Sequence, residues 1–184
     1  MEELEQHEHG RASWWQGYFM KMRGQHLAVS HRTNVADALT AAVGGFIGIG
    51  TLLLLTYMTN TPWLIASLGA SCVLVFGAWN APFSQPRNIL GGHIISGTIG
   101  ISFYELFGAH PLAISAAVAL TIFIMMLTKM IHPPGGGNPI IIMLGGYSWN
   151  YLFTPIIVGA VVIIVYAVIL NNIRQNRHYP LFWW

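Results

Sequence analysis

The residues best placed to do chemistry lie in the segment HPPGGGNP, residues 132–139. Two adjacent prolines and three glycines prevent regular helix there. The segment separates an apolar run that ends near Met130 from one that resumes at Ile140. At membrane depth, broken backbone persists only where protein or a water-filled cavity covers it. A break that carries a His and an Asn therefore predicts a substrate site, and the alternative is an ordinary tight loop at the membrane surface.

The glycines of this segment predict an anion site built from backbone amides. Short helices that begin near Ser67–Ser71 and after His132 would point their N-termini toward each other, and helix N-termini carry unpaired N–H groups and partial positive charge. Glycine lets an anion approach such amides closely. The candidate residues are Ser67, Ser71, Gly135, Gly136 and Gly137, although Ser67 and Ser71 also suit close helix packing. Gly136→Val is predicted to abolish anion flux, with Gly108→Ala as a mild control.

A second group of candidates is the motif QPRN, residues 85–88, followed by His93. The planar guanidinium of Arg87 suits oxyanions such as nitrite or nitrate, and equally suits anchoring to lipid headgroups. Gln85 and Asn88 are expected to hydrogen-bond exposed backbone beside Pro86. His93 lies one turn into an apolar helix, where it either packs or lines a pathway.

His132 and Asn138 have different expected roles. His132 precedes a proline, so its backbone should be extended. Its unperturbed pKa of about 6.5 allows it to lend a proton to a weak-acid anion. Asn138 precedes Pro139, and this order favours Asn138 as a helix N-cap rather than a direct substrate contact.

The composition is that of an integral membrane protein. The chain has 184 residues, of which 54% are hydrophobic and 8% are charged, whereas soluble domains carry about 25% charged residues. Residues 33–171 hold four charged side chains: Asp37, Arg87, Glu105 and Lys129. The single cysteine, Cys72, excludes an intrachain disulfide.

Hydropathy predicts an all-α fold with six apolar segments. They are Ala36–Met58, Trp63–Trp79, Ile89–Phe107, Leu112–Met130, Ile140–Trp149 and Phe153–Asn171. A full span needs about 20 residues, so the first, third, fourth and sixth segments are full spans. The second and fifth are short, and the fifth is expected to be a half-helix. Residues 1–32 form a predicted tail with an interfacial aromatic and basic helix, residues 33–172 the transmembrane domain, and residues 173–184 a C-terminal tail.

Charge placement predicts the topology. If all six segments cross, one side of the membrane receives Lys21, Arg23, Arg32, Arg87, Lys129, Arg174 and Arg177. The positive-inside rule then places both termini in the cytoplasm, and we expect a bacterial inner membrane. If the two short segments re-enter instead, four spans remain and Arg87 and Lys129 face outward.

An internal similarity favours six crossings. Residues 67–79 align with residues 135–147 at an offset of 68, and both have small residues, an apolar run, glycine and an aromatic residue. Two units of three crossings would be inverted relative to each other, which is a recurrent plan of transporters.

The motifs HPPGGGNP, QPRN and the terminal RHYPLFWW resemble the HPP family of small integral membrane proteins over about residues 34–184. The segments at 65–77 and 91–100 are similar to it as well, and Gly135 stands where the family often has Ala. The family is usually described with four spans, which conflicts with six crossings. Plant plastid and cyanobacterial members are associated with nitrite transport, so the resemblance implies a transporter of nitrite or a related small anion.

We therefore expect a transporter that is not an enzyme, with a small inorganic anion and the lipid bilayer as partners. We expect no cofactor, metal or nucleic acid, and self-association of so small a unit into a homo-oligomer. The alternatives are an intramembrane enzyme using His132 and Glu105, and a membrane sensor or scaffold. Motifs for the enzyme are missing: the sequence has no HExxH, paired intramembrane aspartates or G-x-S-x-G.

Overall fold

The computed structural model describes Tyr18, Met22 and residues 34–184. The chain divides into two units, Met1–Arg32 and Thr33–Trp184, and the account below concerns the second. The tail and the aromatic, basic helix predicted for residues 1–32 lie almost entirely outside the described residues. The described part of the chain contains helices and no strand, which confirms the all-α prediction.

Each predicted apolar segment contains a helix. The elements are α2 (Val35–Thr59), α3 (Ala66–Cys72), η1 (Val73–Gly77), η2 (Pro82–Ser84), α4 (Pro86–Phe107), α5 (Pro111–Leu127), η3 (Pro133–Gly137), α6 (Asn138–Gly145), α7 (Trp149–Tyr151), η4 (Leu152–Ile157) and α8 (Val158–Asn172). The π-helical turn η1 extends α3 to Gly77, and η4 joins α7 to α8.

Helix lengths agree in part with the predicted spans. Two helices, Val35–Thr59 and Trp149–Asn172, are long and apolar enough to cross a membrane. The helices Ala66–Gly77 and Pro111–Leu127 are apolar but shorter. Helix α4 has 22 residues, or about 33 Å at 1.5 Å per residue, and it is more polar than these because it carries the QPRN motif and His93. The inverted repeat remains a prediction.

Local sequence accounts for where the helices begin and end. The side chain of Asn34 caps α2 by accepting the amide of Asp37 at 2.7 Å. Proline lies in the first turn of α4, α5 and η3, where a missing N–H costs nothing. Helix α6 ends at Gly145 and is capped by Gly146, whose φ of +64° suits glycine.

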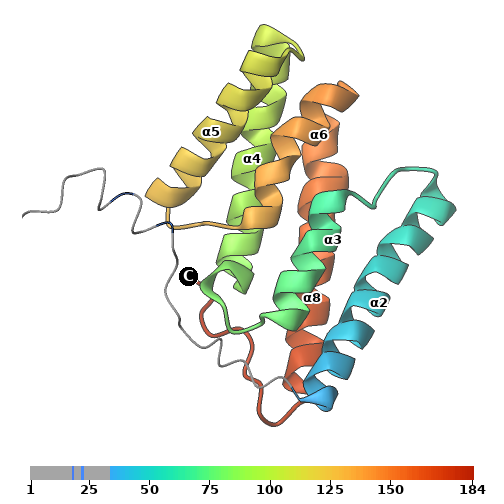
Figure 1. Ribbon diagram of the computed structural model, residues 1–184. Helices are drawn as coiled ribbons and strands as arrows, with labels where there is room; N and C mark the ends of the chain where they lie inside the picture. The colour runs from blue at the N-terminus through green and yellow to red at the C-terminus, as the bar shows by residue number, and fades with distance from the viewer. Residues whose placement is uncertain (1–17, 19–21, 23–33) are drawn as a thin grey trace, which may run out of the picture. The chain divides into compact units, whose positions relative to one another are not determined.

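Helix α4 is the centre of the bundle. It packs against α5 and α6, which lie on either side of it in Figure 1, and also against η3, η4 and α8. Glycines on α4 allow this close approach: a Cβ on Gly92 would lie 2.5 Å from the Cβ of His132, and one on Gly100 would lie 2.8 Å from the Cα of Pro139. The segment 132–139 is therefore held directly against α4.

Successive long helices run in opposite directions (Figure 1), which brings several connections to one end of the bundle. Arg87 donates to the carbonyl of Thr128 at 3.0 Å, and Arg177 forms an ion pair with Asp37 at 3.2 Å. The four Lys and Arg residues of this unit lie on the segments joined by these contacts. This one-sided arrangement agrees with the predicted grouping of basic residues, while the side of the membrane it faces remains a prediction.

Candidate functional site

The proline and glycine segment folds into η3 and the first turn of α6. His132 has extended backbone, with φ −139° and ψ 96°, as the following proline predicts. Its side chain is fully buried. Gly135, Asn138 and Pro139 are buried as well, whereas Pro133 is exposed. The segment therefore runs from the surface of the bundle into its interior.

His132 belongs to a cluster of five buried polar side chains, which we call the polar cluster. Its members come from α3, α4, the start of η3 and α6: Ser71, His93, Ser96, His132 and Asn138. The hydroxyl of Ser71 lies 3.0 Å from Nε2 of His93 and 2.8 Å from Nε2 of His132. The amide nitrogen of Asn138 lies 3.0 Å from Nδ1 of His93 and 2.8 Å from the hydroxyl of Ser96. Nδ1 of His132 lies 2.8 Å from the carbonyl oxygen of Phe83.

These contacts fix the positions of the ring protons. A carbonyl only accepts, so Nδ1 of His132 donates to Phe83 and its Nε2 accepts from Ser71. The side-chain nitrogen of Asn138 only donates, so Nδ1 of His93 accepts and its Nε2 donates to Ser71. The hydroxyl of Ser71 thus accepts from His93, and its single proton has two acceptors, Nε2 of His132 and the carbonyl of Ser67 at 2.9 Å. Hydrogen bonds therefore link Asn138, His93, Ser71, His132 and the carbonyl of Phe83.

The opposite orientation of the Asn138 amide satisfies these hydrogen bonds less well. Nδ1 of His93 would then have to donate, leaving its Nε2 as an acceptor. The single proton of Ser71 would then face three acceptors, Nε2 of His93, Nε2 of His132 and the carbonyl of Ser67, against two in the first orientation. The hydrogen-bond network therefore favours the first amide orientation.

The predicted capping role of Asn138 is wrong. Gly137 occupies the N-cap position, and Asn138 has helical backbone angles as the first residue of α6. Its side chain points into the bundle, where it hydrogen-bonds His93 and Ser96 on the facing side of α4. At the cap position the side chain would instead bond a backbone amide of α6. Sequence reasoning also missed Ser96, which lies three residues after His93 and hence on the same helix face.

Two buried polar atoms near the cluster have no partner within the described part of the chain. One is the carbonyl oxygen Oδ1 of Asn138, and the other is the hydroxyl of Ser67. Ser67 lies one turn before Ser71, whose hydroxyl also approaches the Ser67 carbonyl at 2.9 Å. A buried polar group without a partner costs roughly 1–3 kcal/mol.

The three glycines of the segment differ in their surroundings. Gly135 is buried, and a Cβ there would lie 3.1 Å from the backbone of Gly92. A Cβ on Gly136 or Gly137 meets nothing within 4 Å. All three lie in the 3₁₀-helix η3, whose amides donate to the carbonyl three residues back. An anion at the predicted backbone site would compete with those bonds. For the Gly136→Val test, Gly108 is a poor control because its φ is +69°, and Gly45 is a better one because a Cβ there meets nothing within 4 Å.

The residues of the QPRN motif fasten loops to the start of α4. Arg87 bonds the carbonyl of Thr128, and Asn88 bonds the carbonyls of Lys129 and Ile131 at 3.4 and 2.9 Å. Gln85 donates to the carbonyls of Trp79 and Ala81 and accepts from the amide of Leu181. Gln85 and Asn88 do bond backbone, although not beside Pro86 as expected. These contacts fasten the loop before α4 and the stretch of chain that leads into His132, so we read these residues as positioning residues for His132.

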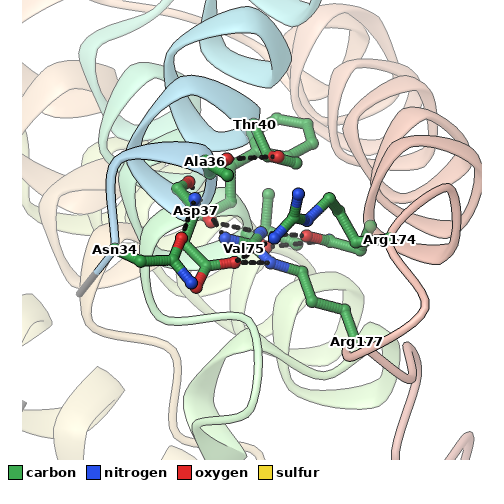
Figure 2. A network of polar contacts seen from close by, with 9 residues as sticks. Asn34, Ala36, Asp37, Thr40, Val75, Arg174 and Arg177 are labelled. Carbon is green, nitrogen blue, oxygen red and sulfur yellow. Dashed lines mark hydrogen bonds and ion pairs between the residues drawn. The ribbon is translucent and has the colours of Figure 1, made fainter. Parts of the chain in front are cut away.

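A second polar network, absent from the sequence-based predictions, fastens the C-terminal residues onto the bundle (Figure 2). Arg177 is buried and donates to Asp37, to the carbonyl of Phe76 and to the side chain of Asn171. Tyr179 donates to the carbonyl of Ser84 at 2.7 Å, and burial raises the pKa of its phenol. The segment predicted as a tail is therefore packed against the loop that carries Phe83.

Other candidates do not join the polar cluster. Glu105 is exposed near the end of α4, about 20 Å along the helix from Gly92, which touches His132. His132 and Glu105, which the enzyme alternative requires to act together, therefore lie far apart. Among the described residues, no group of three or more His, Cys, Asp or Glu side chains is placed to hold a metal ion.

The helices, their apolar composition and their many exposed large apolar side chains define an all-helical integral membrane protein. Residues 30–180 match the family described as HPP, transmembrane region, and the chain belongs to that family.

Two curated transmembrane proteins of Dictyostelium discoideum are similar to the chain. One is 36% identical over 179 residues, covering 91% of this chain and 57% of the relative. The other is 34% identical over 154 residues, covering 77% of this chain and 54% of the relative. The chain thus spans about half the length of these relatives. No solved structure matches it.

Proposed function

We propose that this protein transports a small inorganic anion across the membrane, with nitrite as the first candidate. The observation that carries the proposal is the polar cluster, five hydrogen-bonded side chains buried inside an apolar bundle at a break in the helices. Polar groups at membrane depth are costly and mark substrate pathways, and discontinuous helices form the substrate sites of many transporters.

Two buried atoms without a partner among the described residues, one in the polar cluster and one beside it, suit a small weak acid and its anion. The hydroxyl of Ser67 can donate to an oxyanion, and Oδ1 of Asn138 can accept the O–H of the protonated acid. Nitrite and nitrous acid are such a pair. The resemblance to HPP proteins associated with nitrite transport supports the same substrate.

The test is flux into liposomes that hold the purified full chain. Nitrite, nitrate, formate and chloride are offered separately, with protein-free liposomes as the blank. We expect nitrite to enter fastest, and chloride, which has no acidic proton to place on Asn138, to enter slowest. If none of the four ions enters faster than in the blank, the proposal fails.

A second candidate, an intramembrane hydrolase, has one specific observation in its favour. Ser71 donates to Nε2 of His132, and Nδ1 of His132 is oriented by the Phe83 carbonyl, which is the geometry of a serine nucleophile and its base. Against it, His93 directs its own N–H at the same hydroxyl, and Ser71 is fully buried. A fluorophosphonate probe that labels the wild type but not Ser71→Ala would support the hydrolase, and no labelling would remove it.

A further inference from the structure

An apolar groove, which we call the lipid groove, lies between the start of α4 and the outer face of α8. Its walls include Leu90 of α4, five apolar residues of α8 from Val161 to Ile169, and the tryptophans Trp183 and Trp184. Its volume is about 410 Å³, and of its lining residues Arg87 is the charged one. The proposed function makes no use of this groove.

The length of the lipid groove matches one leaflet of a bilayer. Its α8 wall, from Val161 to Ile169, occupies about 12 Å of helix at 1.5 Å per residue. Helix α8 ends at Asn172, shortly beyond Ile169. Half of a hydrocarbon core is about 15 Å thick. The groove therefore covers the depth of an acyl chain on one side of the membrane.

The tryptophans mark the end of the groove that lies at the headgroups. The amide of Leu181 bonds Oε1 of Gln85, which directly precedes α4, so Trp183 and Trp184 lie at the end of the groove where Arg87 is. Both indole side chains are exposed. Tryptophan is enriched at the membrane–water interface, where its apolar ring and its N–H are both accommodated.

Arg87 supplies an unneutralised positive charge at this end of the groove. Its Nη2 donates to the carbonyl of Thr128, and its Nε is buried without a partner among the described residues. The ion pairs of the described part of the chain are those of Arg174 and Arg177 with Asp37, so Arg87 has no carboxylate beside it. A partly buried charge without a counterion is costly, which favours an anionic partner.

Two further features of the same end favour an anion. Arg87 is the second residue of α4, and the N-terminus of a helix carries partial positive charge. Lys129, which is exposed, follows the Thr128 carbonyl that Arg87 bonds. A phosphate diester suits the remaining donors of the guanidinium, whereas the ammonium of a zwitterionic headgroup is repelled by Lys129.

We propose that the lipid groove binds an anionic phospholipid, with one acyl chain along α8 and the phosphate on Arg87. The predicted topology places this end in the cytoplasmic leaflet, where anionic lipids gather and basic pockets between helices bind their headgroups. The inference goes beyond the proposed function and does not depend on which ion is transported.

A smaller groove on the other side of α8 supplies an internal comparison. It has a volume of about 240 Å³, lies between α2 and α8, and is lined by Arg174. The charge of Arg174 faces Asp37 at 3.8 Å. Because that carboxylate already neutralises it, Arg174 should contribute little to any preference for anionic lipid.

Native mass spectrometry of the purified full chain tests the headgroup. Phosphatidylglycerol and phosphatidylcholine with identical acyl chains compete for the protein in detergent. We expect wild type to bind the first phosphatidylglycerol about fivefold more tightly, the effect of one basic contact with an anionic lipid. Arg87→Gln should remove this preference, and Arg174→Gln should keep it.

Val165→Trp tests the acyl chain and leaves the bond from Arg87 to Thr128 in place. Val165 lines the groove and is 50% exposed, so an indole there fills the space. Binding of both lipids should fall on the order of tenfold, the equivalent of about two buried methylene groups. Val158→Trp is the matched control, since Val158 is exposed on the same helix and lies outside the groove. It should leave lipid binding unchanged.

Three results would overturn the proposal: equal binding of the two lipids by wild type, an undiminished preference in folded Arg87→Gln, or unchanged lipid binding in Val165→Trp. The third result would indicate that another segment of this chain or a second copy occupies the groove. If Arg87→Gln does not fold, the wild-type preference and Val165→Trp still decide. Nitrite flux enters none of these measurements, so the proposed function stands or falls separately.

Discussion

Each ring nitrogen of the two buried histidines, His93 and His132, has a hydrogen-bonding partner. His132 faces a carbonyl and a hydroxyl, and His93 faces an amide nitrogen and the same hydroxyl. Replacing either ring removes one hydrogen bond from the group on each side of it. At the scale of single residues, the structure therefore predicts coupled losses of stability and transport.

His132→Ala should lower both stability and flux. It removes the ring N–H that the carbonyl of Phe83 accepts, at a cost of about 1–3 kcal/mol for the unsatisfied group. The hydroxyl of Ser71 loses one acceptor but keeps the carbonyl of Ser67 and His93. Flux per folded molecule should fall further than the amount of folded protein, and its pH dependence should change. Thermal unfolding in detergent and liposome flux measure the two effects. The exposed His110 supplies the control, His110→Ala. A purified His132→Ala protein with wild-type flux and pH profile would exclude His132 from the mechanism.

Gly135→Ala and Gly136→Ala should differ in stability although they are adjacent. The new Cβ at Gly135 would lie 3.1 Å from the backbone of Gly92, and helix backbone gives way poorly. The expected cost is about 1–3 kcal/mol, as for other overpacked sites. The new Cβ at Gly136 meets nothing within 4 Å, so that variant should unfold near the wild-type temperature. Equal unfolding temperatures for the two variants would show that η3 is not held against α4 as described.

At the scale of elements, the C-terminal segment, residues 173–184, is fastened to one end of the bundle, and we call it the C-terminal clasp. Arg177 ties it to α2 through Asp37, to α8 through Asn171 and to η1 through the Phe76 carbonyl (Figure 2). Tyr179 and Leu181 then reach the loop before α4. The clasp thus holds the same loop that supplies the Phe83 carbonyl to His132.

Arg177→Ala and Arg174→Ala separate a buried from an exposed arginine on this clasp. Arg177 is 3% exposed and pairs with Asp37 at 3.2 Å, whereas Arg174 is 31% exposed and lies 3.8 Å from the same carboxylate. Truncation of a buried partner costs about 3–5 kcal/mol, and an exposed pair contributes about 0–1 kcal/mol. We expect a large fall in unfolding temperature for Arg177→Ala and a small one for Arg174→Ala, measured in the same detergent. A larger fall for Arg174→Ala would contradict the clasp.

At the scale of the whole molecule, α4 is enclosed by its neighbours while large apolar side chains face outward on α2, α5 and α8. Such an exterior suits lipid or a second copy of the chain. The grouping of Lys and Arg at one end of the bundle then predicts which end faces the cytoplasm.

The six-crossing topology places Pro62 and Lys129 on opposite sides of the membrane, with Lys129 in the cytoplasm. If the short segments re-enter, both positions lie outside. Both residues are exposed, so single cysteines introduced there in a Cys72→Ala background can be labelled with an impermeant maleimide. We expect Pro62→Cys to react from outside on intact cells, and Lys129→Cys to react only after the membrane is opened. Labelling of both on intact cells would exclude six crossings.

Self-association is predicted at the same scale. The exposed face of α2 includes Gly50 and Phe46, and small residues beside large ones favour close helix contact in lipid. Native mass spectrometry in mild detergent should show a symmetric oligomer. Monomer alone in several detergents would argue against it.

The sequence by itself determined the class of the protein, its six helical segments, the break at residues 132–139 and its family. These properties are local: hydropathy over about 20 residues, proline and glycine at fixed positions, and short contiguous motifs. The extended backbone of His132 follows from the next residue alone.

Only the tertiary structure decided which polar groups meet. Ser71 contacts His93 across 22 residues of sequence and His132 across 61, and Arg177 reaches Asp37 across 140. Such contacts depend on how glycine-lined helix faces pack, which no local pattern encodes. Asn138 shows the difference most clearly: its sequence context favours a cap, but once α6 lies against α4, its side chain gives the buried Nδ1 of His93 a hydrogen-bond donor and also bonds Ser96.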